Sequence, residues 1–181
     1  MRFLSVSSLI LVLSQLLLLA SAQAQNESWE RARLASELLS HPRVDALDFQ
    51  ISGRRDAATA QDNLEQASRG MMARRSHYGR APGGWTHLDV RMLRALLTLA
   101  NEGYSFRLTS IAGGSHSSKS RHYSGLAFDV DRVNGHRVHS RHPSARRFIA
   151  RCQQLGATQV FGPGTRGHSS HLHIAWSPVT R

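Results

Sequence analysis

Two segments in which apolar and polar residues alternate constrain the fold of this chain more than any other feature. Residues 126–131 and 171–176 both show this period of two, which is typical of strands with one face in a core and one face open. On the open face, the first segment places Asp129 beside the small Ala127, and the second places His171 and His173. We therefore expect a sheet whose polar face offers one carboxylate and two imidazoles.

A loop before the first of these strands adds a third imidazole. His122 lies seven residues before Asp129, and Gly125 lies between them. Glycine lets the backbone turn, so that His122 can return over the same face of the sheet. Together with His171 and His173, these residues supply three metal ligands and one spare base, which are the parts of a hydrolytic zinc site.

Taken singly, these residues carry little information. The chain has 11 histidines in 181 residues, so an H-x-H pair is expected by chance in about one of two such chains. Alone, His122 reads as an ordinary loop histidine, and Asp129 as a strand carboxylate in a salt bridge. Only the joint pattern of His122, Asp129 and His173 favours metal binding over these alternatives.

The N-terminus predicts export. Arg2 precedes an apolar run over residues 3–19, and small residues in A-x-A order follow over 20–24. This arrangement is typical of a cleavable signal peptide, here residues 1–22, and favours a periplasmic or secreted location. A membrane anchor is less favoured, because serines and a glutamine interrupt the run and it falls short of about 20 apolar residues. No membrane span is expected after cleavage.

The charge of the chain predicts a polyanionic partner. Lys and Arg number 23 against 12 Asp and Glu, a net charge of +11, and removal of the signal peptide takes away only Arg2. Nucleic acid is the usual partner of so basic a chain, but the basic residues are scattered and export argues against it. A carboxylate-rich cell wall or an anionic envelope surface suits an exported basic protein better.

The mature chain has the length of one compact domain. We expect residues 23–83 to form a helical N-terminal portion and residues 84–181 to form the core. Helices are expected over 27–39, within 56–75 and over 87–102, and a short strand over 106–109. Thr86 and Asp89 resemble a capping box, and Gly103 a C-terminal cap. The single Cys152 excludes an intramolecular disulfide and is expected to be a packed thiol.

The order S-x-H-x-x-G-x-A-x-D from Ser120 to Asp129, followed by the late H-x-H, resembles a group of zinc peptidases. The group contains lysostaphin, the D-Ala-D-Ala carboxypeptidases and the hedgehog signalling domain. Ser120–His122 is similar to the carboxypeptidase version of the motif. Gly167–His173 resembles the G-H-x-x-H-x-H ending of penicillin-insensitive murein endopeptidases. The resemblance covers residues 105–176 and implies a small α+β fold, in which a central antiparallel sheet with flanking helices holds zinc in its groove.

Carried over to this chain, the resemblance implies one zinc ion per chain, bound by His122, Asp129 and His173. It makes His171 the catalytic base or the transition-state stabiliser, and it gives Ser120 a contact with the substrate. The chemistry agrees, because two neutral imidazoles and one carboxylate leave positive charge on the metal, which activates water and polarises an amide carbonyl.

Two positions depart from the pattern of the group. Many relatives have a glutamate three residues before the last ligand, where this chain has Ser170, so the base must be His171. Many also have an arginine that clamps the substrate carboxylate, in a turn that here spans residues 110–116 without one. The residues that we consider as substitutes or as further substrate contacts are Arg107, Arg121, His116 and His168.

From the sequence we expect a monomeric, exported zinc peptidase that cleaves an amide bond next to D-alanine in peptidoglycan stem peptides or cross-links. Whether it is a carboxypeptidase or an endopeptidase stays open. One alternative is a non-catalytic zinc-binding module of the cell wall or envelope, as the hedgehog domain exemplifies. Another is a peptidase acting on ordinary envelope proteins.

Overall fold

The computed structural model of the chain describes residues 6–139 and 143–179. Within these residues the fold is α+β, as expected, and comprises four α-helices, a six-stranded sheet and a two-stranded ribbon. The helices are α1 (Val6–Ser40), α2 (Ala60–Ser68), α3 (Val90–Asn101) and α4 (Pro143–Gln154), with a short 3-10 helix η1 (Arg121–Ser124). The main sheet contains β1 (Val44–Ala46), β4 (Phe106–Ser110), β5 (Ala127–Val133), β6 (His136–Arg137), β7 (Gln159–Phe161) and β8 (Leu172–Ala175). In the ribbon, β2 (Ala73–Arg74) pairs with β3 (Trp85–Thr86).

The main sheet is mixed. Its strand order is β1-β4-β5-β8-β7, and β6 pairs with the end of β5. The prediction of an antiparallel sheet holds for β4, β5, β8 and β7 but is wrong at one edge, where β1 runs parallel to β4. The reason lies in the N-terminal portion, which was not expected to add a strand. Both β1 and β4 follow a helix, and these two helices, α1 and α3, pack against each other.

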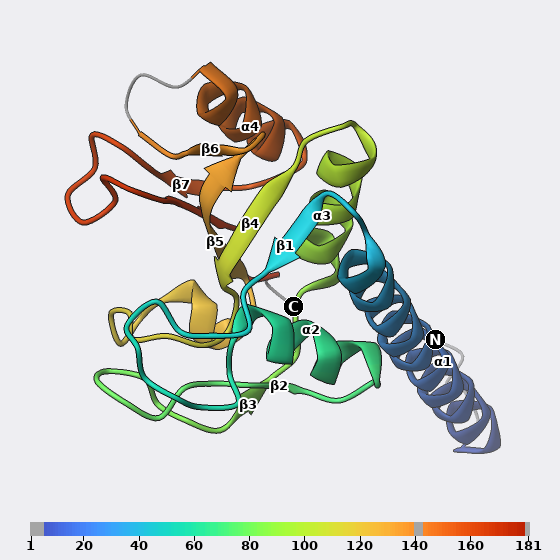
Figure 1. The fold of residues 1–181 in the computed structure, drawn as a ribbon. Coiled ribbons are helices and arrows are strands. Elements are labelled where there is room, and N and C mark those ends of the chain that lie inside the picture. Colours follow the sequence, from blue (N-terminus) through green and yellow to red (C-terminus); the bar gives the residue numbers. More distant parts are fainter. Residues whose placement is uncertain (1–5, 140–142, 180–181) are drawn as a thin grey trace.

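The two faces of the sheet have opposite character. Residues from three neighbouring strands form the apolar face and are at most 3% exposed, namely Phe106, Leu108, Phe128, Val130, Leu172 and Ile174. In Figure 1, α1 and α3 lie on one side of the sheet, and the loop after β1, η1 and the loop between β7 and β8 lie on the other. Each fully buried leucine in this core stabilises the fold by about 1.5–3 kcal/mol. The predicted alternation of apolar and polar side chains is therefore confirmed, but the face that was expected to be open is covered as well, since Ala127, Asp129 and His173 are at most 6% exposed.

The helices of the N-terminal portion differ from the expected ones in length. The helix expected over 27–39 belongs to the longer α1, whereas the stretch 56–75 yields only α2. Thr59 and Asp62 form a capping box that starts α2, and the positive φ of Gly70 (75°) follows its end. The sequence analysis missed this box.

At α3, the expected helix is confirmed but its predicted capping box is wrong. Asp89 is itself the N-cap and accepts hydrogen bonds from the backbone N–H of Arg91 and of Met92. Thr86 instead belongs to β3. Gly103 follows the C-cap with a φ of 95°, as its predicted role requires.

The predicted signal segment lies partly outside the described residues, which begin at residue 6. Residues 6–22 form the first half of α1, and the leucines at 16–19 are 57–71% exposed. No helix in the described part of the chain is long and apolar enough to cross a membrane.

Gly125 follows η1 and packs against the residues just before α3. Its φ is 67°, and a Cβ at this position would lie 2.1 Å from the carbonyl oxygen of His87. The backbone N–H of Asp89 donates to the Gly125 carbonyl (2.9 Å). Arg31 on α1 donates from Nε to the carbonyl of Leu88 (2.7 Å). The turn that carries η1 is therefore held directly against the helical layer.

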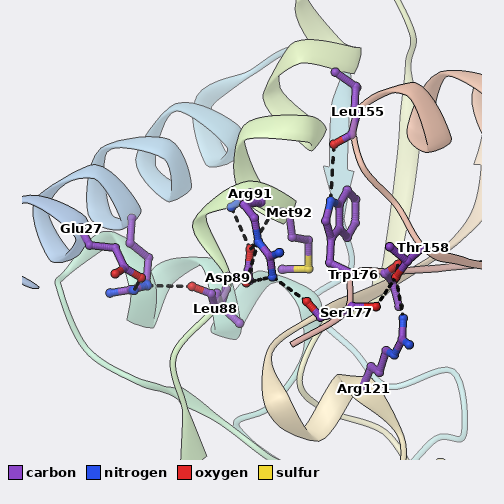
Figure 2. A network of polar contacts seen from close by, with 12 residues as sticks. Glu27, Leu88, Asp89, Arg91, Met92, Arg121, Leu155, Thr158, Trp176 and Ser177 are labelled. Atoms are coloured by element: carbon purple, nitrogen blue, oxygen red, sulfur yellow. Dashed lines mark hydrogen bonds and ion pairs between the residues drawn. The ribbon is translucent and has the colours of Figure 1, made fainter. Parts of the chain in front are cut away.

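A second set of hydrogen bonds links η1 to β8 and α3 (Figure 2). Arg91 on α3 donates to the carbonyl of Ser177, just after β8 (2.9 Å). The hydroxyl of Ser177 lies 3.0 Å from that of Thr158, which also accepts a hydrogen bond from Arg121 in η1 (2.9 Å). These contacts fix η1 relative to β8 across a long separation in the sequence.

Substitution of Gly125 tests this arrangement. We expect Gly125→Ala to lower the free energy of unfolding by about 3 kcal/mol or more, because the methyl group would meet a backbone carbonyl and the residue would keep a left-handed conformation. Gly135→Ala is the matched control, since Gly135 has a similar φ of 77° and open space around its Cβ position. It should cost only about 1 kcal/mol. Urea denaturation of the three proteins measures both values, and equal losses would contradict the role of the His87 contact.

Candidate metal centre

Three potential ligand atoms converge where β5 and β8 lie side by side. The register pairs Asp129 with His173, and η1 brings His122 over the same face. The Nε2 of His122 lies 3.0 Å from the Nδ1 of His173 and 3.2 Å from the Oδ1 of Asp129, and the last two atoms are 3.0 Å apart. All three residues are at most 6% exposed. The structure thus brings together the three residues that the sequence analysis assigned as ligands.

The spacing of these atoms fits a zinc-sized ion. Bonds of about 2.0 Å in a tetrahedral site place neighbouring ligand atoms about 3.3 Å apart. The separations of 3.0–3.2 Å between the three atoms are close to this value. The three atoms therefore match one face of a tetrahedron.

The outer nitrogens of both imidazoles have acceptors. Nδ1 of His122 lies 2.6 Å from the carbonyl oxygen of Ile111, which can only accept, so this nitrogen carries the hydrogen and Nε2 presents a lone pair. Nε2 of His173 lies 3.4 Å from Oε1 of Gln159, and its Nδ1 lies 3.0 Å from Oδ1 of Asp129. An inner ring nitrogen that carries a hydrogen donates it to Asp129, but where the hydrogen of His173 is on Nε2, two lone pairs and a carboxylate oxygen face one another. A cation between them would relieve this repulsion, and such outer partners are typical of metal-binding histidines.

The ionisation of Asp129 and His173 suits metal binding. Burial favours the protonated carboxyl of Asp129, but the charges and hydrogen bonds of His122 and His173 outweigh it and hold the pKa of Asp129 well below its usual value. Burial also lowers the pKa of His173. At neutral pH the site therefore contains an ionised carboxylate and a neutral His173, the protonation states in which both groups bind metal.

His116 offers an alternative to His173. The cluster of His116, His122 and Asp129 could hold a metal ion, with ligand atoms within 4.8 Å of one another. However, the His116 ring stacks on that of His122, with centroids 3.9 Å apart and planes 11° apart. The lone pairs of His116 lie in the plane of its own ring, so they point parallel to the His122 ring and do not converge with the lone pair of His122. In addition, the Nε2 of His116 is 3.0 Å from the Gly113 carbonyl oxygen. We favour the set with His173, whose three atoms are closer and better directed.

His116 is suited to remain neutral. The pKa of His116 is lowered to about 3, chiefly by burial and secondly by the neighbouring His122. The sequence analysis considered this residue only as a substrate contact, and nothing in the spacing of the chain indicated the stacked position.

His171 lies at the edge of the metal centre and lines the same cavities as Asp129. It is half-buried, and burial lowers its pKa. A neutral imidazole at this position can accept a proton near neutral pH. The ring of His168, in the loop between β7 and β8, lies 4.9 Å from that of His171 and 5.0 Å from that of Phe161.

Arg107 is held in an ion pair. Its guanidinium binds the carboxylate of Asp131 through two hydrogen bonds of 2.8 and 2.5 Å. Asp131 lines a cavity beside the metal centre, and the charge of Arg107 is largely neutralised there. A substrate carboxylate would therefore have to compete with Asp131 for this arginine.

Ser120 and Arg121 each have a structural contact as well as a place in the cavity. The Ser120 hydroxyl accepts from the backbone N–H of His122 as the N-cap of η1 (3.4 Å). Arg121 donates to Thr158. Both residues also line the second of the two cavities, so they can meet a substrate while they hold η1.

Two cavities meet at the metal centre. The residues that line both are Ser115, His116, Asp129 and His171. The first cavity has a volume of about 400 Å³ and is also lined by Gln50, Ile51, Ser52, Tyr78, Asp131 and Val138. The second has a volume of about 530 Å³ and is also lined by Lys119, Ser120, Arg121, Gln159, Phe161 and His168. The centre thus lies within a cleft that continues in two directions.

The N-terminal portion supports the turn that orients His122. Asn63 on α2 is fully buried and accepts from the backbone N–H of Ala112 (2.8 Å). Ser76 accepts from the N–H of Gly114 (2.8 Å). This turn carries the carbonyl of Ile111 that holds His122. Sequence reasoning missed these supporting residues, because their partners lie far away in the chain.

No protein-family model, no curated protein and no solved structure matches this chain. The resemblance to zinc peptidases therefore depends on the motif residues alone.

The two possible ligand sets predict different zinc contents for the His173→Ala and His116→Ala variants. His173→Ala should lose the zinc bound by the wild type, because only two ligands would remain. His116→Ala should keep about one zinc ion per chain. Metal analysis after equilibration with zinc measures both contents. Loss of zinc from the His116 variant, with retention in the His173 variant, would show that the stacked histidine is the third ligand.

Gln159 is expected to tune the affinity through His173. Gln159→Leu removes the acceptor for Nε2 and should weaken zinc binding about 10-fold, as loss of such an outer partner commonly does. Gln153→Leu, at an exposed site on α4, is the matched control and should leave the affinity unchanged. Competition with a chromophoric chelator gives the three dissociation constants. Equal values for all three proteins would mean that Gln159 does not hold His173.

Proposed function

We propose that this protein is an exported zinc peptidase that hydrolyses an amide bond next to D-alanine in peptidoglycan stem peptides or cross-links. The observation that carries the proposal is the meeting of three convergent ligand atoms with a neutral, half-buried His171 inside a cleft. The motif residues Ser120–Asp129 and Gly167–His173, which resemble zinc peptidases, supply the reaction class.

The donor set fits zinc. Two imidazole nitrogens and one carboxylate oxygen, with a fourth position open, are typical of catalytic zinc sites. Zinc bound by His122, Asp129 and His173 would supply Lewis acidity toward an amide carbonyl and make water nucleophilic near neutral pH.

His171 is the residue that moves the proton. It accepts a proton from the attacking water as the hydroxyl adds to the amide carbon, and it delivers that proton to the leaving nitrogen as the C–N bond breaks. Ser170, at the position where many relatives have a glutamate, is exposed and cannot serve as this base. Asp129 is committed to the metal centre, and two histidines line both cavities with it, His116 and His171. His116 stacks on His122 and its Nε2 contacts the Gly113 carbonyl, so His171 is the better placed base.

The substrate class follows from charge and location. Peptidoglycan peptides carry several carboxylates, and Lys119 and Arg121 line one arm of the cleft. The net charge of +11 would also favour binding to an anionic wall. Export is supported by the apolar run over residues 3–19 and by the exposed leucines within it at 16–19.

Replacement of His171 tests the proposal. His171→Ala should keep zinc, since His171 is not among the convergent ligands, and should lower the turnover of muropeptides by about 10²–10⁴-fold through loss of the base. Chromatography of digested sacculi and stem peptides measures the activity, and metal analysis of the same samples measures the zinc.

The other outcomes identify the alternatives. Wild-type protein that binds zinc but leaves sacculi and stem peptides intact would indicate a binding module. Digestion of unfolded L-peptides would indicate a peptidase of envelope proteins. Full activity in the His171 variant would refute the assignment of the base.

A further inference from the structure

The cleft continues past the metal centre in two directions. One arm follows β5 toward the strand that pairs with its end, since Asp131 and Val138 line it. The other arm crosses β8 toward the edge strand, since Gln159 and Phe161 line it. Because β5 and β8 are neighbours and hold the ligands, the arms extend to different sides of the centre. The volume of each arm alone is within the range of about 300–1,000 Å³ that is typical of ligand sites.

The wall of the first arm comes from the N-terminal portion, outside the segment that resembles zinc peptidases. Gln50, Ile51, Ser52 and Tyr78 line it. The Tyr78 hydroxyl lies 3.1 Å from that of Ser52, which ties two separate loops together. We call this set, residues 50–52 with Tyr78, the N-terminal wall.

The N-terminal wall is held in place from behind. The side chain of Gln50 is buried and donates to the carbonyl of Ala58 (3.0 Å) and to Asp56 (2.9 Å). Ile51 beside it is 62% exposed at the cleft. An apolar side chain is thus presented to the cleft by a loop that hydrogen bonds fix.

The two arms differ in the side chains that line them. The first has the apolar side chains of Ile51 and Val138 and the ring of Tyr78 beside one cation, Arg137, and its Asp131 carboxylate is paired with Arg107. The second has two cations, Lys119 and Arg121, and no aliphatic side chain among the residues that line it. The first arm is suited to methyl groups and aliphatic chains of a peptide, and the second to its carboxylates.

We infer that the N-terminal wall forms a binding subsite, so that the substrate peptide occupies the cleft on both sides of the scissile bond. The enzyme is then an endopeptidase that cuts within cross-linked stem peptides, and Ile51 is a specificity-determining residue. An enzyme that removes one terminal residue needs only a small subsite closed around that residue. The inference rests on the proposed function for the reaction that is catalysed, but binding of a peptide to the subsite can be measured without that reaction.

Binding to an inactive variant tests the subsite. Zinc-loaded His171→Ala protein is titrated in a calorimeter with a cross-linked muropeptide dimer and with an uncross-linked pentapeptide. We expect the dimer to bind about 10-fold more tightly, because it fills both arms. Adding Ile51→Ala should weaken dimer binding about 5-fold through loss of an apolar contact.

Phe49→Ala is the matched control. Phe49 is 54% exposed and lies two residues before Ile51, but it lines a different cavity. This variant should leave dimer binding unchanged. Equal affinities for dimer and pentapeptide, no effect of Ile51→Ala, or an equal loss with Phe49→Ala would each overturn the inference.

The wild-type enzyme separates this inference from the proposed function. Incubated with zinc and the dimer, it should cut the cross-link. If the dimer stays intact but the affinities follow the expected pattern, the peptidase activity is refuted and the binding subsite is supported. If terminal D-alanine is released from the pentapeptide but the dimer is not cut, the peptidase activity is supported and the endopeptidase assignment is overturned.

Discussion

The polar face of the sheet depends on the convergence of three potential ligand atoms, which lie within 3.0–3.2 Å of one another: Nε2 of His122, Nδ1 of His173 and Oδ1 of Asp129. Nδ1 of His122 donates to the carbonyl of Ile111, and Nε2 of His173 faces the amide oxygen of Gln159. With the hydrogens on these outer nitrogens, both inner nitrogens present lone pairs beside the Asp129 carboxylate. Buried acceptors that face one another in this way are destabilising unless a cation lies between them.

The fold positions these three atoms through contacts that are far apart in the chain. Hydrogen bonds from α1 and α3 hold the turn at Gly125, and the contact from Arg121 through Thr158 fixes η1 beside β8. From the opposite side, Asn63 holds the turn that follows β4. The N-terminal portion is therefore a structural part of the site, since it supports the ligand His122 and forms one wall of the cleft.

The sequence predicted those features that depend on local pattern. Alternation placed Asp129 and His173 on one face, and Gly125 marked the turn that returns His122. The sequence could not predict features that depend on the register between distant segments. The Arg107–Asp131 pair forms across two strands whose register shifts near Leu108, and β1 pairs in parallel with β4, which lies far from it in the chain. The stacking of His116 has no signature in the spacing of residues.

X-ray absorption spectroscopy of the zinc-loaded protein is the most direct test of the metal centre. The account predicts four light-atom ligands at about 2.0 Å, with the multiple scattering of two imidazoles, that of His122 and that of His173. The same shell should persist in the His116→Ala protein. A shell of three imidazoles, or a fully hydrated ion, would contradict the account, because the three convergent atoms would then not be the ligands.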